Sequence, residues 1–262
     1  MPQSQASLHS SPTPRQYGDV AAVYDALMDV VPHTAWLNRI ERAVRERGKS
    51  PQSVLEVACG TGIVTEMLYQ HGYRPVYGID ISGAMVQIAK TKAEAKGLPI
   101  AYQEQDAAKL DLNGTRFDLV VSLFDSLNYI TEPEHLRQAF LRVYQHLNSG
   151  GIFAFDLNSV YALTTEMFTQ TNLEGPIRHV WNSYWDADTR LCRVEMAFEV
   201  IDAETGERRQ FTETHVQRGY TQTEIKSYLS EAGFVNVQVF GNYGDRTPNA
   251  KSDRWLFITE KS

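Results

Sequence analysis

Short apolar runs alternate with helical patterns along most of the chain, and this alternation constrains the fold more than any other feature. The first five runs lie at residues 53–59, 75–81, 100–105, 117–123 and 152–157. The run at 117–123 is almost continuously apolar, which is typical of a strand covered on both sides. Strands that alternate with helices imply right-handed crossovers and a parallel sheet. Two more strands are expected near the C-terminal end, at 235–240 and 255–259.

Residues 177–220 break this alternation. Val194, Met196 and Phe198 are separated by single residues, which is the period of a half-covered strand. Residues 202–206 (DAETG) have the composition of a hairpin loop. We therefore predict one domain over residues 1–262, with an antiparallel β insertion at 177–220. A helix is expected at 33–48, and residues 1–16, rich in Ser, Pro and Gln, are expected to form a mobile lead-in rather than a signal peptide.

The bulk properties exclude several classes of function. The chain of 262 residues has a net charge of −7, which disfavours a nucleic-acid partner because such binding depends on Lys and Arg neutralising phosphates. No apolar stretch approaches the ~20 residues of a membrane span. Cys59 and Cys192 lie too far apart in sequence to suggest a zinc site or a disulfide framework. We expect a cytoplasmic protein with no metal and no membrane or nucleic-acid partner.

A glycine-rich turn, Gly60-Thr61-Gly62, separates the first strand from the first helix of the alternating region. Such a turn lets the backbone approach a ligand because no Cβ atom intervenes. The dinucleotide fingerprint G-x-G-x-x-G requires a third glycine at position 65, which is Thr65. The alternative register requires glycine at Ala58 and Ile63. Both registers fail, so a dinucleotide is not the expected ligand.

Acidic residues follow the next two strands. Asp80 ends the second strand and can accept hydrogen bonds from ribose hydroxyls. Asp106 follows the third strand and can accept from the exocyclic amine of an adenine. Ligands of open α/β sheets bind at the carboxyl ends of the strands, where these residues lie. The pattern therefore predicts an adenosine-containing ligand.

The chain resembles the class I S-adenosylmethionine-dependent methyltransferases, and in particular their bacterial small-molecule branch. Residues 56–62, Asp80, Met85, Asp106-Ala107 and 123–129 match motifs of that family in the expected order. One departure is Ala58, where glycine is commoner. The resemblance implies a Rossmann-like α/β fold with a mostly parallel seven-stranded sheet and helices on both faces. It also implies that S-adenosyl-L-methionine is bound, and S-adenosyl-L-homocysteine released, by Tyr17, Tyr24, Glu56, Ala58, Gly60, Gly62, Asp80, Ile81, Met85, Asp106, Ala107 and Leu123.

Some of these roles have a structural alternative. Glu56 either contacts the cofactor or organises the glycine loop through hydrogen bonds. Tyr17 and Tyr24 either cover the cofactor or pack as ordinary helix residues. His215 is the candidate general base because the pKa of histidine lies near neutrality, but a hydrogen-bonded structural role is the favoured explanation. Asp125, Asn128 and Tyr129 follow the fourth strand, and at least one of them is expected to line the acceptor pocket.

These residues predict methyl transfer to nitrogen or oxygen of a small metabolite. The alternatives are a methyltransferase that acts on protein or RNA, and a regulator that binds S-adenosylmethionine without turnover. A homodimer is left open, because the aromatic residues Trp181, Tyr184 and Trp185 of the insertion suit either a pocket cover or a subunit contact.

Overall fold

The computed structural model describes residues 17–244 and 246–262, so the predicted lead-in at 1–16 lies outside the described residues. The main sheet has seven strands in the order β10-β11-β5-β4-β1-β2-β3. All pairs are parallel except those made by β11, which is antiparallel to both neighbours. The strands are β1 (Val54–Val57), β2 (Val76–Asp80), β3 (Ala101–Glu104), β4 (Phe117–Ser122), β5 (Leu147–Asn158), β10 (Phe234–Gly241) and β11 (Arg254–Lys261). The predicted Rossmann-like sheet is confirmed.

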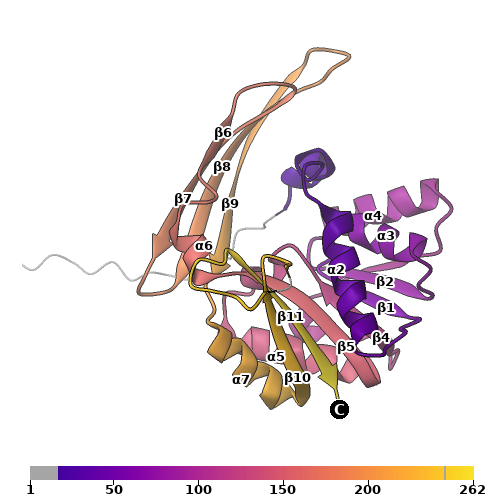
Figure 1. The fold of residues 1–262 in the computed structure, drawn as a ribbon. Coiled ribbons are helices and arrows are strands. Elements are labelled where there is room, and N and C mark those ends of the chain that lie inside the picture. Colours follow the sequence, from indigo (N-terminus) through magenta and orange to yellow (C-terminus); the bar gives the residue numbers. More distant parts are fainter. Residues whose placement is uncertain (1–16, 245) are drawn as a thin grey trace, which may run out of the picture.

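Helices cover both faces of the sheet (Figure 1). One face carries α2 (His33–Glu46), α3 (Ile63–Gln70) and α4 (Gly83–Ala95), and the other carries α5 (Pro133–His146) and α7 (Gln222–Ala232). Each helix turns an apolar stripe to the sheet, because its apolar residues recur at helical spacing. On α2 this stripe is Leu37, Ile40 and Val44, all buried.

The helix ends follow ordinary capping chemistry. Thr221 and Glu224 form a reciprocal capping box at the start of α7. Gly233 ends that helix in the left-handed conformation, with φ of 100°. The structure begins β5 directly after α5, so residues 148–151 lie inside the strand, which starts before the run predicted at 152–157. A register irregularity between β4 and β5 accommodates Gly150 and Gly151 there.

The insertion forms a second, antiparallel sheet in the order β6-β7-β8-β9. Its strands are β6 (Gln170–Asn172), β7 (Ile177–Asp186), β8 (Leu191–Ile201) and β9 (Arg208–Arg218), and they extend away from the main sheet (Figure 1). The β8–β9 hairpin turns at the predicted loop, residues 202–206. One face is apolar because Val194, Met196 and Phe198 project to the same side, where Val20 and Leu163 pack with them.

Short helical segments complete the chain. The segments η1 (Val20–Val23) and α1 (Tyr24–Leu27) precede α2 and were not predicted, because each is only about one turn long. The others are η2 (Ala107–Lys109), η3 (Ser126–Tyr129) and α6 (Val160–Thr164). The segments η2 and η3 follow strands β3 and β4, at the sheet edge where the candidate site lies.

Candidate active site

The glycine loop after β1 has the conformation that a ligand-binding turn requires. Ala58, Gly60 and Gly62 all have positive φ, at 58°, 54° and 82°. A Cβ atom on Gly60 would meet only Tyr24, at 3.7 Å, whereas one on Gly62 would lie 2.4 Å from the Tyr102 hydroxyl oxygen. Packing against Tyr102 therefore excludes a side chain at Gly62, whereas at Gly60 only the positive φ favours glycine.

A small cavity lies above this loop. Its lining includes residues predicted to hold the cofactor, namely Tyr24, Glu56, Ala58, Gly60 and Leu123, and also His33, Cys59, Thr61, Ile63, Val64, Phe124 and Ser126. The lining residues that follow β1 and β4 lie together because these two strands are adjacent in the sheet, whereas Asp80, Ile81, Met85, Asp106 and Ala107 lie outside the lining.

Asp80 joins two loops at the carboxyl end of β2. Its carboxylate accepts hydrogen bonds from the backbone N–H of Gly60 and of Ser82, each at 2.8 Å. Burial raises the pKa of Asp80, and these backbone hydrogen bonds oppose that effect. Each carboxylate oxygen retains a second lone pair, so Asp80 can also accept from ribose hydroxyls. Asp80 therefore shapes the site as well as offering acceptor groups.

The environment of Glu56 differs from that of Asp80. Glu56 is buried beneath the loop, and its carboxyl group accepts a hydrogen bond from the Thr65 hydroxyl. Burial raises the pKa of Glu56 to about 8, although the Thr65 hydrogen bond opposes the rise. The predicted alternatives for Glu56 therefore both have support, since it bonds to the first turn of α3 and also lines the cavity.

The adenine-side candidates are placed at the ends of β2 and β3. Ile81 is 70% exposed, which is unusual for a large apolar side chain and fits a residue that packs against a ligand ring. Asp106 caps η2 by accepting from the backbone N–H of Ala108 at 2.9 Å, and its side chain stays 32% exposed. Ala107 opens η2, and Met85 is buried within α4. The roles of these side chains at the adenosine end of the cofactor stay predictions.

The N-terminal segment reaches over the site and touches the insertion. Ser82 donates from its hydroxyl to the Tyr17 carbonyl oxygen at 3.1 Å, which ties Tyr17 to the loop after β2. The backbone N–H groups of Tyr17 and Val20 donate to Glu213 of β9, at 2.9 and 2.8 Å. Tyr24 lies edge-on to Tyr17, with ring centroids 5.8 Å apart. The two tyrosines predicted as a cover therefore lie between the glycine loop and β9.

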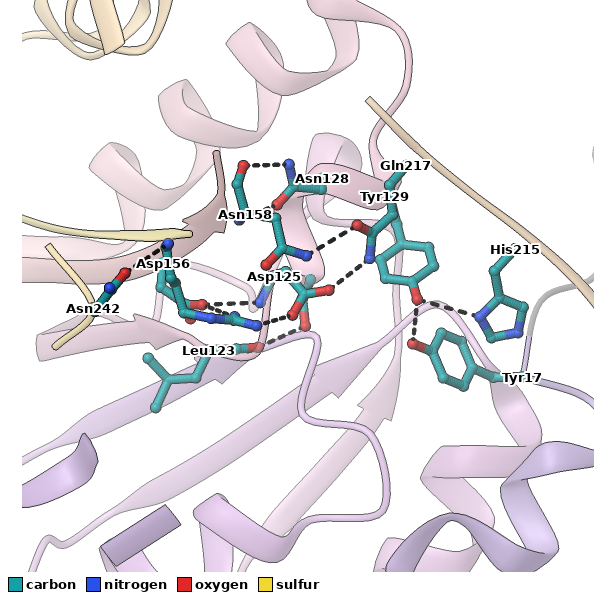
Figure 2. Close-up of polar contacts among 12 residues, drawn as sticks. Tyr17, Leu123, Asp125, Asn128, Tyr129, Asp156, Asn158, His215, Gln217 and Asn242 are labelled. Carbon is teal, nitrogen blue, oxygen red and sulfur yellow. Dashed lines mark hydrogen bonds and ion pairs between the residues drawn. The ribbon is translucent and has the colours of Figure 1, made fainter. Parts of the chain in front are cut away.

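A chain of hydrogen bonds links two predicted catalytic residues (Figure 2). The Tyr17 hydroxyl donates to the Tyr129 hydroxyl oxygen at 2.8 Å. The Tyr129 hydroxyl lies 3.2 Å from Nδ1 of His215, and Nε2 of His215 lies 3.0 Å from the Glu213 carboxylate. An ionised carboxylate only accepts, so Nε2 carries the proton and Nδ1 accepts from Tyr129. Burial alone would raise the pKa of Glu213, but hydrogen bonds from His215, Val20 and Tyr17 lower it below its ordinary value.

The side chain of Asn128, the third catalytic candidate, bonds to backbone groups. Its amide nitrogen donates to the carbonyl oxygens of Asn158 and Arg218, at 3.2 and 2.9 Å, and its oxygen accepts from the Asn158 N–H at 2.9 Å. The side chain is fully buried and joins the ends of β5 and β9. The structure brings Tyr129 and His215 together, whereas Asn128 bonds to the ends of β5 and β9.

An ion cluster behind the loop after β4 had no counterpart in the sequence prediction. Arg254 of β11 pairs with Asp125 at 2.7 Å and with Asp156 of β5 (Figure 2). Gln217 donates to the other Asp125 oxygen at 2.6 Å. Burial raises the pKa of Asp125, while Arg254 opposes the rise. No sequence pattern joins positions 125 and 254, because the contact depends on which strands are neighbours.

Comparison with known proteins assigns the family. The family described as "Methyltransferase domain" matches residues 54–151. A methyltransferase-family protein of Geobacillus sp. (strain WCH70) is 31% identical over 250 residues, which cover 94% of this chain and 99% of the relative. The chain belongs to the class I S-adenosylmethionine-dependent methyltransferases.

Two further relatives are informative. An S-adenosylmethionine-dependent methyltransferase from Clostridium acetobutylicum has a crystal structure that matches with a TM-score of 0.83 and 27% identity, over 94% of this chain and 99% of that chain. A dTDP-4-amino-2,3,4,6-tetradeoxy-D-glucose N,N-dimethyltransferase of Saccharopolyspora spinosa is 26% identical over 248 residues, or 92% of each protein. The predicted enzyme class is thus confirmed. Within the described part of the methyltransferase, no helix is both long and apolar enough to cross a membrane.

Proposed function

We propose that this methyltransferase transfers the methyl group of S-adenosylmethionine to a nitrogen or oxygen of a small-molecule acceptor bound beside Tyr129. The observation that carries the proposal is the buried Tyr129–His215–Glu213 chain, which lies next to the N-terminal segment above the glycine loop. Support for a small-molecule acceptor comes from the Saccharopolyspora relative, whose name specifies an amino sugar.

The cofactor residues have separate tasks in this proposal. Asp80 and Asp106 accept hydrogen bonds from the ribose and adenine, Ile81 packs on the adenine ring, and the loop from Ala58 to Gly62 faces the methionine end. The bound cofactor supplies an electrophilic methyl carbon on a sulfonium. The cavity walls then align that carbon with the acceptor and exclude water, which contributes much of the rate in an in-line displacement.

The hydrogen-bonded chain from Tyr129 to His215 can take up the proton that the acceptor loses on methylation. Bound S-adenosylmethionine would supply its methyl group to the acceptor nitrogen or oxygen, and the electron pair of the broken carbon–sulfur bond would stay on sulfur as S-adenosylhomocysteine. The acceptor loses one proton, which the Tyr129 hydroxyl accepts while passing its own proton to Nδ1 of His215. Glu213 holds Nε2–H of His215 and stabilises the imidazolium that results. A hydroxyl acceptor needs this base more than a neutral amine does.

Two measurements test the proposal. Calorimetric titration should show binding of S-adenosylmethionine and S-adenosylhomocysteine and none of NAD. Turnover is then measured with the amino-sugar substrate of the Saccharopolyspora relative and with a panel of amines and phenols. Binding without turnover of any acceptor would favour a regulator, and NAD binding alone would overturn the site assignment.

A variant pair then tests the proton path. His215→Ala should lower kcat by about a hundredfold or more, the usual contribution of a general base. His71→Ala is the matched control, because His71 ends α3 and pairs with Glu41 outside the cavity lining. Full turnover of His215→Ala would remove His215 from the mechanism.

A further inference from the structure

The loop after β4 has an unfavourable backbone conformation, which surrounding contacts must stabilise. Phe124 and Asp125 are consecutive non-glycine residues with positive φ, at 64° and 53°. The left-handed region is disfavoured for residues with a Cβ atom, and such residues persist where surrounding contacts fix them. The residues on both sides of Asp125, namely Phe124 and Ser126, line the cavity above the glycine loop, as does Leu123.

The side chain of Asp125 is anchored to the neighbouring strands. Its Oδ1 accepts from Arg254 at 2.7 Å, and its Oδ2 accepts from Gln217 at 2.6 Å. Its backbone N–H donates to Asp156 at 3.1 Å, and Asp156 is itself bound by Arg254. The backbone and the side chain of the strained residue are therefore both attached to one carboxylate–guanidinium cluster (Figure 2).

Arg254 is also fixed by aromatic packing. Its guanidinium lies 5.1 Å from the ring centroid of Trp36, which stacks on Tyr243 at 4.4 Å and on Phe124 at 4.9 Å. Phe124 is the other strained residue of the loop, so Arg254 supports it through Trp36. A guanidinium is planar and has several donors, so it can bond to two carboxylates and lie over a ring face at the same time. A lysine cannot do this.

We propose that Arg254 is a positioning residue that holds the loop from Leu123 to Ser126 in the conformation that shapes the methionine end of the cofactor cavity. The inference rests on the proposed placement of the cofactor and does not depend on the acceptor. Arg254 does not line the cavity. It acts through Asp125 and Asp156, and through Trp36 against Phe124.

The test compares two ligands that differ at the methionine end. S-adenosylhomocysteine carries the amino-acid group, and 5′-methylthioadenosine lacks it but keeps the adenosine and the thioether. In Arg254→Met, affinity for S-adenosylhomocysteine should fall about tenfold, or about 1.4 kcal/mol, while affinity for 5′-methylthioadenosine changes less than about twofold. A general loss of structure would lower the affinity for both ligands equally.

The control is Arg190→Met, which removes another paired arginine. Arg190 bonds to Glu224 at 2.8 and 2.7 Å, away from the cavity lining, and its loss should alter neither affinity. If Arg254→Met does not fold, Arg254→Lys and Asp125→Asn carry the same comparison. Unchanged S-adenosylhomocysteine binding, or an equal loss for both ligands, would overturn the inference. Absence of S-adenosylhomocysteine binding in the wild type would instead refute the proposed function.

Discussion

Glu56→Gln should make this protein more stable at alkaline pH, because Glu56 is an acid that the fold keeps protonated. Its pKa rises from 4.5 to about 8 on burial. Between these two values the folded state holds a proton that the unfolded state has lost, so the stability of the wild type falls as pH rises through that window. A pKa difference of one is worth about 1.4 kcal/mol, so the total penalty above pH 8 is on the order of 4 to 5 kcal/mol.

Glutamine has the same shape and cannot ionise. Its amide oxygen can still accept the hydrogen bond that Thr65 donates to Glu56. The free energies of unfolding of wild type and Glu56→Gln should therefore be similar near pH 5 and should diverge progressively up to pH 9, with the variant more stable.

Urea unfolding of the ligand-free protein at pH values from 5 to 9 measures this difference directly. Taking the difference between the two proteins cancels the contributions of all other titrating groups. Glu46→Gln is the control, because Glu46 is exposed at the end of α2 and its substitution should not reproduce the divergence. A constant difference between wild type and Glu56→Gln would show that Glu56 is ionised in the fold, and the reasoning from burial would fail.

Three shorter predictions concern the loops. Asp80→Ala leaves the N–H groups of Gly60 and Ser82 without their carboxylate acceptor. Calorimetry should therefore show S-adenosylhomocysteine affinity reduced by at least about tenfold, and unchanged affinity would remove Asp80 from the site. In urea titrations, Gly62→Ala should lower the free energy of unfolding by more than Gly60→Ala does, because only the Gly62 variant places a Cβ atom against Tyr102. Equal losses of stability in the two variants would contradict the packing argument. Tyr17→Phe should lower kcat more than it lowers cofactor affinity, since only the hydroxyl joins the chain to Tyr129; a loss of affinity alone would assign Tyr17 to the cofactor.

The sheet could be predicted from sequence because its strands are buried and its turns have distinctive chemistry. The run at 117–123 is apolar since β4 lies between β1 and β5 and both its faces are covered. Gly60 and Gly62 marked the first loop because few residues other than glycine adopt positive φ without cost. Asp80 was predicted as a site residue from its place after the second strand, but the sequence did not show that it bonds to Gly60.

Other parts of the fold carry no local signal. Strand β6 consists of the exposed polar residues Gln170–Asn172, so no apolar pattern marks it. Asn128 and His215 were both plausible catalytic residues by position. Only the three-dimensional contacts show that Asn128 bonds to backbone groups while His215 bonds to Tyr129. The Arg254–Asp125 pair depends on β11 lying next to β5, a topology that residue spacing does not encode.

The position of Glu213 makes the insertion part of the proposed active site. Because Glu213 binds the N–H groups of Tyr17 and Val20 as well as His215, one carboxylate joins the N-terminal segment to the proposed proton path. Lifting this segment breaks those two bonds and the Tyr17–Tyr129 bond, at a net cost of about 2 to 5 kcal/mol. The Tyr129 hydroxyl oxygen has a second lone pair, so an acceptor can donate to it while Tyr17 remains bonded there. Acceptor binding and the position of the segment over the cofactor are therefore coupled through the same hydroxyl group.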